Sequence, residues 1–186
     1  MKEKQKKINK SRYAILGMLF EKPLSGYQIK QKMQNYTTHF WQESDASIYP
    51  MLKKLEEEGK VASRSEYVGK RERKIFSTTR SGKNEFTKWF QMPAEPQKPR
   101  SELLLRLYFS ANAKNKEHVI TQLKEALEKN LVQKERYKRI KKDVLAGIPD
   151  EHPHKMFWLM ALKSGIIHNN ANRKWLQECI QILENK

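Results

Sequence analysis

The stretch from residue 44 to residue 59 constrains the fold more than any other part of this chain. Ile48, Leu52 and Leu55 recur at helical spacing, so a helix over these residues turns all three inward. The outward positions carry small, hydroxyl-bearing and cationic side chains, a set that suits close contact with phosphates and base edges. They are Ser47, Pro50, Lys53 and Lys54, flanked by Ala46 and Tyr49. The stretch predicts a DNA recognition helix, although an ordinary amphipathic surface helix has the same stripe.

The ends of this helix are marked by a proline and a glycine. Pro50 lacks an amide hydrogen and belongs in a first helical turn, and the residue before a proline resists helical torsions. This favours a regular helix that begins nearer Ser47 than Asp45, without deciding the point. Gly59 stands where a left-handed cap commonly ends a helix.

Two shorter helices are predicted ahead of the recognition helix. Residues 13–20 are apolar nearly all round, which is typical of a buried helix, and Lys22-Pro23 ends it. Ser25 then resembles an N-cap, with Gln28 completing a capping box. Residues 35–40 are polar and turn-like. Helix, helix and recognition helix in this order predict a helix-turn-helix unit.

After the recognition helix the period of the sequence changes from helical to alternating. Residues 61–67 and 73–79 alternate in the manner of two strands, and a break at Gly69 separates them. The predicted hairpin has its tip at residues 69–74, where four of six residues are basic. Such a tip can reach phosphates or a minor groove. The alternative is that the charges only protect an edge strand from pairing.

Net charge supports a polyanionic partner. The chain carries 38 Lys and Arg against 21 Asp and Glu, a net charge of +17, whereas roughly 2–8 suffices to keep a small domain soluble. This favours nucleic acid or an anionic membrane surface. One cysteine excludes an intrachain disulfide and indicates a reducing, cytoplasmic setting. No apolar run approaches the roughly 20 residues of a membrane span, and no secretory signal is recognised.

Three prolines between residues 93 and 99 predict a semi-rigid linker and a domain boundary. The expected domains are a winged helix-turn-helix over residues 1–92, a linker over 93–100 and a helical dimerisation domain over 101–186. In the last, residues 101–109 are apolar almost all round, Asn115 caps a long helix to about Ala146, and a final helix starts after Pro153. The expected fold class is mainly α with a small β-hairpin. Because the long helices exceed what one small domain can bury, we expect a homodimer.

The chain resembles the PadR family of bacterial transcriptional regulators over about residues 12–90. The resemblance rests on residues 13–17 (YAILG), 24–27 (LSGY), 47–50 (SIYP) with Leu52, Leu55, Glu56 and Gly59, and 74–79 (KIFSTT) with Gly82. Residues 101–184 resemble, more loosely, the long helical C-terminal domain of the subgroup with phenolic-acid-responsive and virulence-activator-like members.

This resemblance implies a winged-helix homodimer that binds an inverted-repeat operator, usually as a repressor, and is often released by a small aromatic or drug-like ligand. Transferred residue by residue, it implies groove contacts from Ser47 and Tyr49 with Lys53 beside them. It implies backbone contacts from Ser25 and Tyr27, and wing contacts from Lys70, Arg71 and Arg73. Trp41 and Gln42 match no motif, so base preference is not transferred.

Other candidate sites are weaker. Tyr108, Phe109, Trp158 and Trp175 are candidates to line an aromatic ligand pocket, although aromatic residues of this kind more often form a core. His152, His154 and His168, with Glu151 nearby, match no strong zinc spacing, so no metal site is expected. No phosphate loop, nucleophile elbow or carboxylate pair is recognised, and we expect neither a cofactor nor enzymatic activity.

The predicted function is a dimeric, ligand-responsive transcriptional regulator. One alternative is a basic protein that coats DNA or RNA without an operator of its own. Both bind in a salt-dependent manner, but only a regulator prefers one site by about 10³-fold or more over random duplex. A second alternative is an enzyme or small-molecule-binding protein that uses the aromatic helices.

Overall fold

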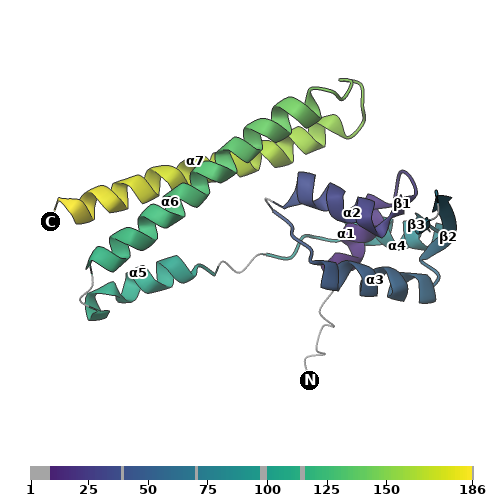
Figure 1. Ribbon diagram of the computed structural model, residues 1–186, viewed down its shortest axis with the longest axis horizontal. Coiled ribbons are helices and arrows are strands. Elements are labelled where there is room, and N and C mark those ends of the chain that lie inside the picture. Colours follow the sequence, from purple (N-terminus) through teal and green to yellow (C-terminus); the bar gives the residue numbers. More distant parts are fainter. Residues whose placement is uncertain (1–8, 39, 70, 97–99, 114–115, 186) are drawn as a thin grey trace. The chain divides into compact units, whose positions relative to one another are not determined.

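The computed structural model describes residues 9–38, 40–69, 71–96, 100–113 and 116–185 (Figure 1). The chain divides into two compact units, Met1–Glu95 and Pro96–Lys186, which we describe separately. None of the helices in the described ranges is long and apolar enough to cross a membrane.

The first unit has the helix order predicted for a winged helix-turn-helix. Ser25 caps α2 as predicted, because its side chain accepts from Gln28 N–H while the Gln28 side chain accepts from Ser25 N–H. Gly59 ends the recognition helix with a φ of 64°, also as predicted. The elements are α1 Lys10–Met18, β1 Leu24–Ser25, α2 Gly26–Lys32, η1 Met33–Thr37, α3 Asp45–Glu57, β2 Val61–Val68, β3 Arg71–Thr78 and α4 Arg80–Phe90.

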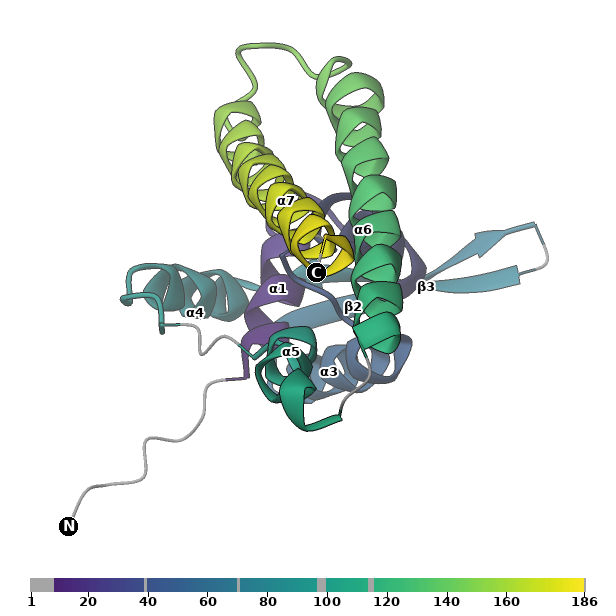
Figure 2. The ribbon, with the colours of Figure 1, turned by 90° about the vertical axis from the view of Figure 1, so that its left-hand side faces the viewer.

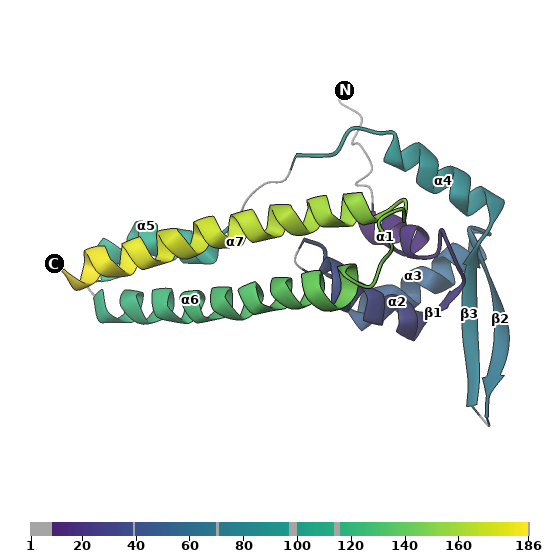
Figure 3. The ribbon, with the colours of Figure 1, turned by 90° about the horizontal axis from the view of Figure 1, so that it is seen from above.

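The sheet of this unit has one strand more than the predicted hairpin. The described residues form an antiparallel sheet in the order β1-β3-β2, with Ser25 opposite Ile75. β1 has two residues, the second of which is the N-cap Ser25, so it shows no alternation by which the sequence could reveal it. It fixes the start of α2 against the base of the wing. The β2–β3 hairpin projects away from the helices of the unit (Figures 2 and 3).

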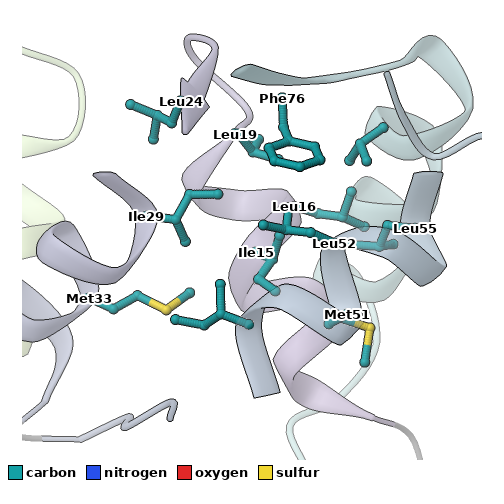
Figure 4. Close-up of a cluster of buried hydrophobic side chains, with 12 residues drawn as sticks. Ile15, Leu16, Leu19, Leu24, Ile29, Met33, Met51, Leu52, Leu55 and Phe76 are labelled. Atoms are coloured by element: carbon teal, nitrogen blue, oxygen red, sulfur yellow. The ribbon is translucent and has the colours of Figure 1, made fainter. Parts of the chain in front are cut away.

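The predicted inward stripe of the recognition helix forms the centre of the core. Ile48, Leu52 and Leu55 are at most 1% exposed, and they contact α1 through Ile15 and Leu16. Figure 4 shows Leu52 and Leu55 of α3 among the side chains of this cluster, which come from α1, α2, α3 and β3. One face of α3 is therefore committed to the core and the opposite face is left to solvent.

The structure decides one helix boundary that the sequence left open and corrects another. α3 begins at Asp45, with Ser44 as the N-cap and Pro50 inside the helix. Residues 35–37 are not a turn but continue α2 as the π-helical segment η1. There the Thr37 and Thr38 hydroxyls donate to the carbonyls of Met33 and Gln34, which extends the helix beyond its apolar stripe.

The second unit is built on a helical hairpin. α6 (Lys116–Arg139) and its π-helical extension η2 (Ile140–Leu145) run beside α7 (Lys155–Glu184) (Figure 3). α5 (Glu102–Ala113) contacts α6. The long helix thus ends at Leu145, close to the predicted Ala146. Its predicted cap, Asn115, lies outside the described residues.

A buried amide pair separates two apolar clusters in this hairpin. Asn130 Nδ2 donates to the Asn169 carbonyl at 2.9 Å, and Asn169 Nδ2 donates to the Asn130 carbonyl at 3.3 Å. Leu123 and Leu176 lie in one cluster, and Tyr137 lies in the other. Because a one-residue slip of either helix leaves both amides buried without partners, the pair fixes the helix register.

Arg12 ties three helices of the first unit together. Its guanidinium donates to the Glu85 carboxylate of α4, with Nη2 at 2.9 Å, and pairs with Glu58 at the end of α3 at 2.5 Å. Lys60 Nζ lies 3.3 Å from Glu85 as well. The hydrogen bond from Arg12 is the main cause that lowers the pKa of Glu85 below its usual value.

We expect Glu85→Gln to lower the free energy of unfolding at pH 7 by about 2 kcal/mol, the range of a charged hydrogen bond. A lowered folded-state pKa stabilises the fold above the ordinary pKa of a carboxyl, and this contribution is lost as pH falls through the folded value. Urea titration should therefore show the difference in unfolding free energy between the variant and the original protein closing as pH falls below the ordinary pKa of a carboxyl. Glu135→Gln, at an exposed pair with Lys138, serves as control. Equal stabilities of Glu85→Gln and the original protein at pH 7 contradict the assignment.

Candidate nucleic-acid interface

The face of α3 opposite the core carries the predicted groove-facing residues. Tyr49 is 50% exposed, and the Lys53 side chain is 78% exposed. Ala46, Pro50 and Lys54 are also exposed on this helix. Cationic and aromatic side chains thus share one solvent-facing surface, the arrangement that contact with a duplex requires.

The Tyr49 ring is held in place by the start of α2. A Cβ built on Gly26 would lie 2.6 Å from Cε1 of Tyr49, closer than real contacts allow, so the ring packs directly on the glycine backbone. Tyr27, the next residue, is 61% exposed, and its hydroxyl accepts from Gln31 Nε2 at 3.1 Å. The absence of a side chain at residue 26 therefore sets where the aromatic ring of α3 lies.

We expect Gly26→Ala to displace the Tyr49 ring and to weaken binding to a specific duplex roughly tenfold, about 1.4 kcal/mol. The melting temperature should change little, because a half-exposed ring can swing into solvent. When Tyr49 is already alanine, Gly26→Ala should cause no further loss of affinity for the duplex. Fluorescence anisotropy of the two single variants and the double variant measures this double-mutant cycle. A full additional loss in that background contradicts the assignment.

A carboxylate that sequence reasoning missed lies at the N-terminal end of α3. Glu43 accepts from Trp41 Nε1 at 2.8 Å through Oε1 and from Ser47 Oγ at 2.7 Å through Oε2. The Ser47 hydroxyl, half-buried, also lies 2.8 Å from the Ser44 carbonyl. The i, i+4 spacing of Glu43 and Ser47 is the only sequence signal for this cluster, and it gains meaning only once the helix start is known.

The side chains of Ser25 and Arg73, two of the expected DNA contacts, bind each other. Ser25 is only 3% exposed, and its Oγ accepts from Gln28 N–H and from Arg73 Nη2 at 2.9 Å. In this structure, capping and the contact with Arg73 engage the Ser25 hydroxyl, and the backbone contact expected from Ser25 stays a prediction. Arg73 is half-buried, and its bond to Ser25 connects β3 with the start of α2.

The wing is longer in its strands and shorter in its turn than predicted. β2 and β3 pair through Val68 opposite Arg71, so residues 71–74 of the predicted tip (69–74) belong to β3. Lys70 lies outside the described residues, and Arg71 is described only through its backbone in β3. On the strands, Arg64 pairs with Glu66 at 2.7 Å.

The acidic end of the recognition helix is neutralised within the unit. Lys74 Nζ donates to Glu56 Oε2 at 2.8 Å, and Ser63 donates to Oε1 of the same carboxylate. The bond from Lys74 is the main cause of a lowered pKa at Glu56. With Glu58 held by Arg12, Glu56 and Glu58 present paired carboxylates, which reduces their repulsion of a polyanion.

The four aromatic residues proposed for a ligand pocket are not brought together in one chain. Tyr108 and Phe109 stack edge to face on α5 and are 82% and 52% exposed. Trp175 packs in the apolar cluster around Leu176, whereas Trp158, seventeen residues earlier, is about 25 Å away along the same helix. The four side chains are thus spread along α5 and α7, so a pocket within one copy would use only some of them.

The histidines near Trp158 form an aromatic cluster. His152 and His154 lie 5.1 and 5.7 Å from the Trp158 ring, centroid to centroid. In the part of the chain that the structure describes, no three His, Cys, Asp or Glu side chains are grouped to hold a metal ion.

Two family models match the chain. Residues 15–88 match the transcriptional regulator PadR-like family, and residues 99–184 match the virulence activator alpha C-terminal family. Together the two matches cover both compact units.

Individual relatives agree with these matches. The negative transcriptional regulator PadR of Bacillus subtilis is 38% identical over 100 residues, which are 53% of this chain and 55% of that protein, so the alignment spans about half of the relative. The crystal structure of B. subtilis PadR with operator DNA superimposes with a TM-score of 0.83 at 26% identity, over 96% of this chain and 99% of that one. The PadR-like transcriptional regulator BC1756 of Bacillus cereus gives 0.78 at 30% identity, over 94% and 98%.

Proposed function

We propose a DNA-binding regulatory function for this chain, which belongs to the PadR-like family of transcriptional regulators. One observation carries the proposal. The described face of α3 presents Tyr49 and Lys53 to solvent beside a projecting wing, in a fold that B. subtilis PadR uses in a complex with operator DNA. We assign DNA binding to residues 1–92, a linker to 93–100 and dimerisation to 101–186.

The operator we propose is an inverted repeat read by a homodimer. Met156, Met160 and Ile167 form an exposed apolar stripe on α7, at 56–58% exposure, turned away from the side that packs on α6. Exposed apolar stripes of this kind support burial against another copy. A two-fold dimer presents two recognition helices related by the same axis, which favours a palindromic site with half-sites about 34 Å apart.

We further propose that the protein is a repressor released by a small aromatic ligand. The B. subtilis relative is named a negative regulator, and another crystal structure of that protein contains p-coumaric acid. In this chain, Tyr108, Phe109, Trp158 and Trp175 remain the candidate contacts, drawn from different copies or used in part.

Selection of bound duplexes from a random pool tests the DNA-binding proposal. A regulator enriches one palindrome and prefers it to random duplex by about 10³-fold or more at fixed salt. The competing function is a protein that coats nucleic acid without sequence preference, for which the charge of +17 is the supporting observation. Such a protein binds in a salt-dependent way but leaves the pool unselected, and that result would overturn the regulator.

A further inference from the structure

We propose that Glu43 and Ser47 act together as a specificity-determining pair that selects an amino-bearing base, adenine or cytosine, at one position of each half-site. The proposal rests on the proposed DNA-binding function and deepens it. It concerns whether the Ser47 hydroxyl, at the N-terminal end of α3, donates a hydrogen bond to a base or accepts one.

The Glu43 carboxylate is fixed by donors on two sides. Trp41 Nε1 can only donate, and it does so to Oε1 at 2.8 Å. Ser47 Oγ donates to Oε2 at 2.7 Å. Because the two contacts engage different oxygens, the carboxylate is oriented at both ends and needs no large rearrangement to keep its bond with Ser47.

This arrangement commits the only proton of the Ser47 hydroxyl. The Ser44 carbonyl, 2.8 Å from Ser47 Oγ, is an alternative acceptor for this proton, and it too belongs to the chain itself. With either acceptor the proton is directed at the protein and not at the duplex. Ser44 Oγ lies 3.4 Å away and occupies at most one of the two lone pairs on Ser47 Oγ. Toward a bound duplex, Ser47 is therefore an acceptor and not a donor. An unconstrained serine could serve as either.

An acceptor at this place discriminates between bases. In the major groove, adenine N6 and cytosine N4 offer amino donors, whereas guanine and thymine offer the acceptors O6, N7 and O4. Two acceptors facing each other leave both groups unsatisfied. The negative charge of Glu43 adds to this preference, because it attracts an amino group and repels a carbonyl oxygen.

The carboxylate also has a favourable position for its charge. It lies just before the first turn of α3, where the helix dipole stabilises an anion. Lys53 and Lys54 follow on the same helix and are exposed, so the attraction to phosphates is retained further along. Glu43 can thus select at one base without removing the basic character of the helix.

Selection from a random duplex pool with three variants tests the pair. The original protein should enrich a site in which one position per half-site is adenine or cytosine by roughly tenfold over guanine or thymine. Ser47→Ala removes the acceptor and should relax that position alone. Glu43→Gln removes the negative charge and supplies an amide that donates to Ser47 Oγ and occupies one of its lone pairs, while the Ser44 carbonyl still accepts the Ser47 proton. This variant should relax the preference at the same position. Glu135→Gln removes one negative charge from an exposed pair on α6 and should leave every position unchanged.

The outcomes separate this proposal from the proposed function. If all four proteins enrich the same site with the same preferences, or if the affected position favours guanine or thymine in the original protein, the pair does not select a base and the regulator stands. If no protein enriches any site, the proposed function fails and this inference fails with it. Circular dichroism melting curves, expected to coincide, exclude unfolding of Ser47→Ala and Glu43→Gln as the cause.

Discussion

Replacing Tyr49 and Lys53 together with alanine is expected to lower affinity for the selected duplex by about 100-fold or more, equivalent to about 2.7 kcal/mol. Each base contact typically contributes about 1–3 kcal/mol to discrimination, and the lysine adds a phosphate contact. Because one ring is half-exposed and the ammonium group is largely exposed, the fold should remain intact. Anisotropy titrations at several salt concentrations measure both the loss and a salt slope reduced by about one.

A matched control separates groove contact from lost charge. Lys129→Ala removes an exposed cation from α6 and should leave specific affinity within about threefold, about 0.6 kcal/mol. If the variant with alanine at Tyr49 and Lys53 binds the duplex as tightly as this control does, α3 does not contact the DNA. Equal losses in both variants mean that net charge, and not a recognition helix, governs binding.

The second large effect is expected from the proposed dimer. Met156→Glu with Met160→Glu places two carboxylates per copy on the exposed apolar stripe of α7. Burial of unpaired charges is costly enough that we expect a monomer at micromolar concentration. Affinity for a palindromic duplex should then fall by about 10³-fold, because each copy holds only one half-site. Sedimentation equilibrium gives the mass, and anisotropy gives the affinity.

The control for this variant adds the same charge elsewhere on the same helix. Gln177→Glu with Gln181→Glu has the same spacing at exposed positions and should remain dimeric. If Met156→Glu with Met160→Glu also stays dimeric, the stripe is not the interface. If the original protein is itself monomeric at micromolar concentration, the dimer proposal is lost altogether.

Features encoded by local spacing were predictable from the sequence. The Ser25–Gln28 capping box, the inward stripe through Leu52 and the left-handed end at Gly59 each depend on residues within one or two helical turns. Their physical causes act at short range, so no knowledge of the tertiary structure is needed. The order of helices and wing followed from the same signals.

Features that depend on distant pairing were not predictable. Arg73 reaches Ser25 across 48 positions of the chain, and β1 exists only because β3 lies beside it. The role of Glu43 depends on Trp41 and on where α3 begins, a point that the sequence left open between Asp45 and Ser47. The first turn starts at Asp45 because the Ser44 carbonyl accepts from the backbone N–H groups of Ser47 and Ile48.

Cleavage of the duplex from a chelated iron on α3 tests the central claim most directly. Glu57, whose side chain is 63% exposed on this helix, is replaced by cysteine, to which the iron chelate is attached. Cys179, the chain's one cysteine, is replaced by serine so that the chelate labels α3 alone. Two recognition helices in successive major grooves should produce two clusters of strand breaks, related by two-fold symmetry and about 34 Å apart. A single cluster, or breaks spread evenly along the duplex, contradicts a dimer that reads DNA through α3.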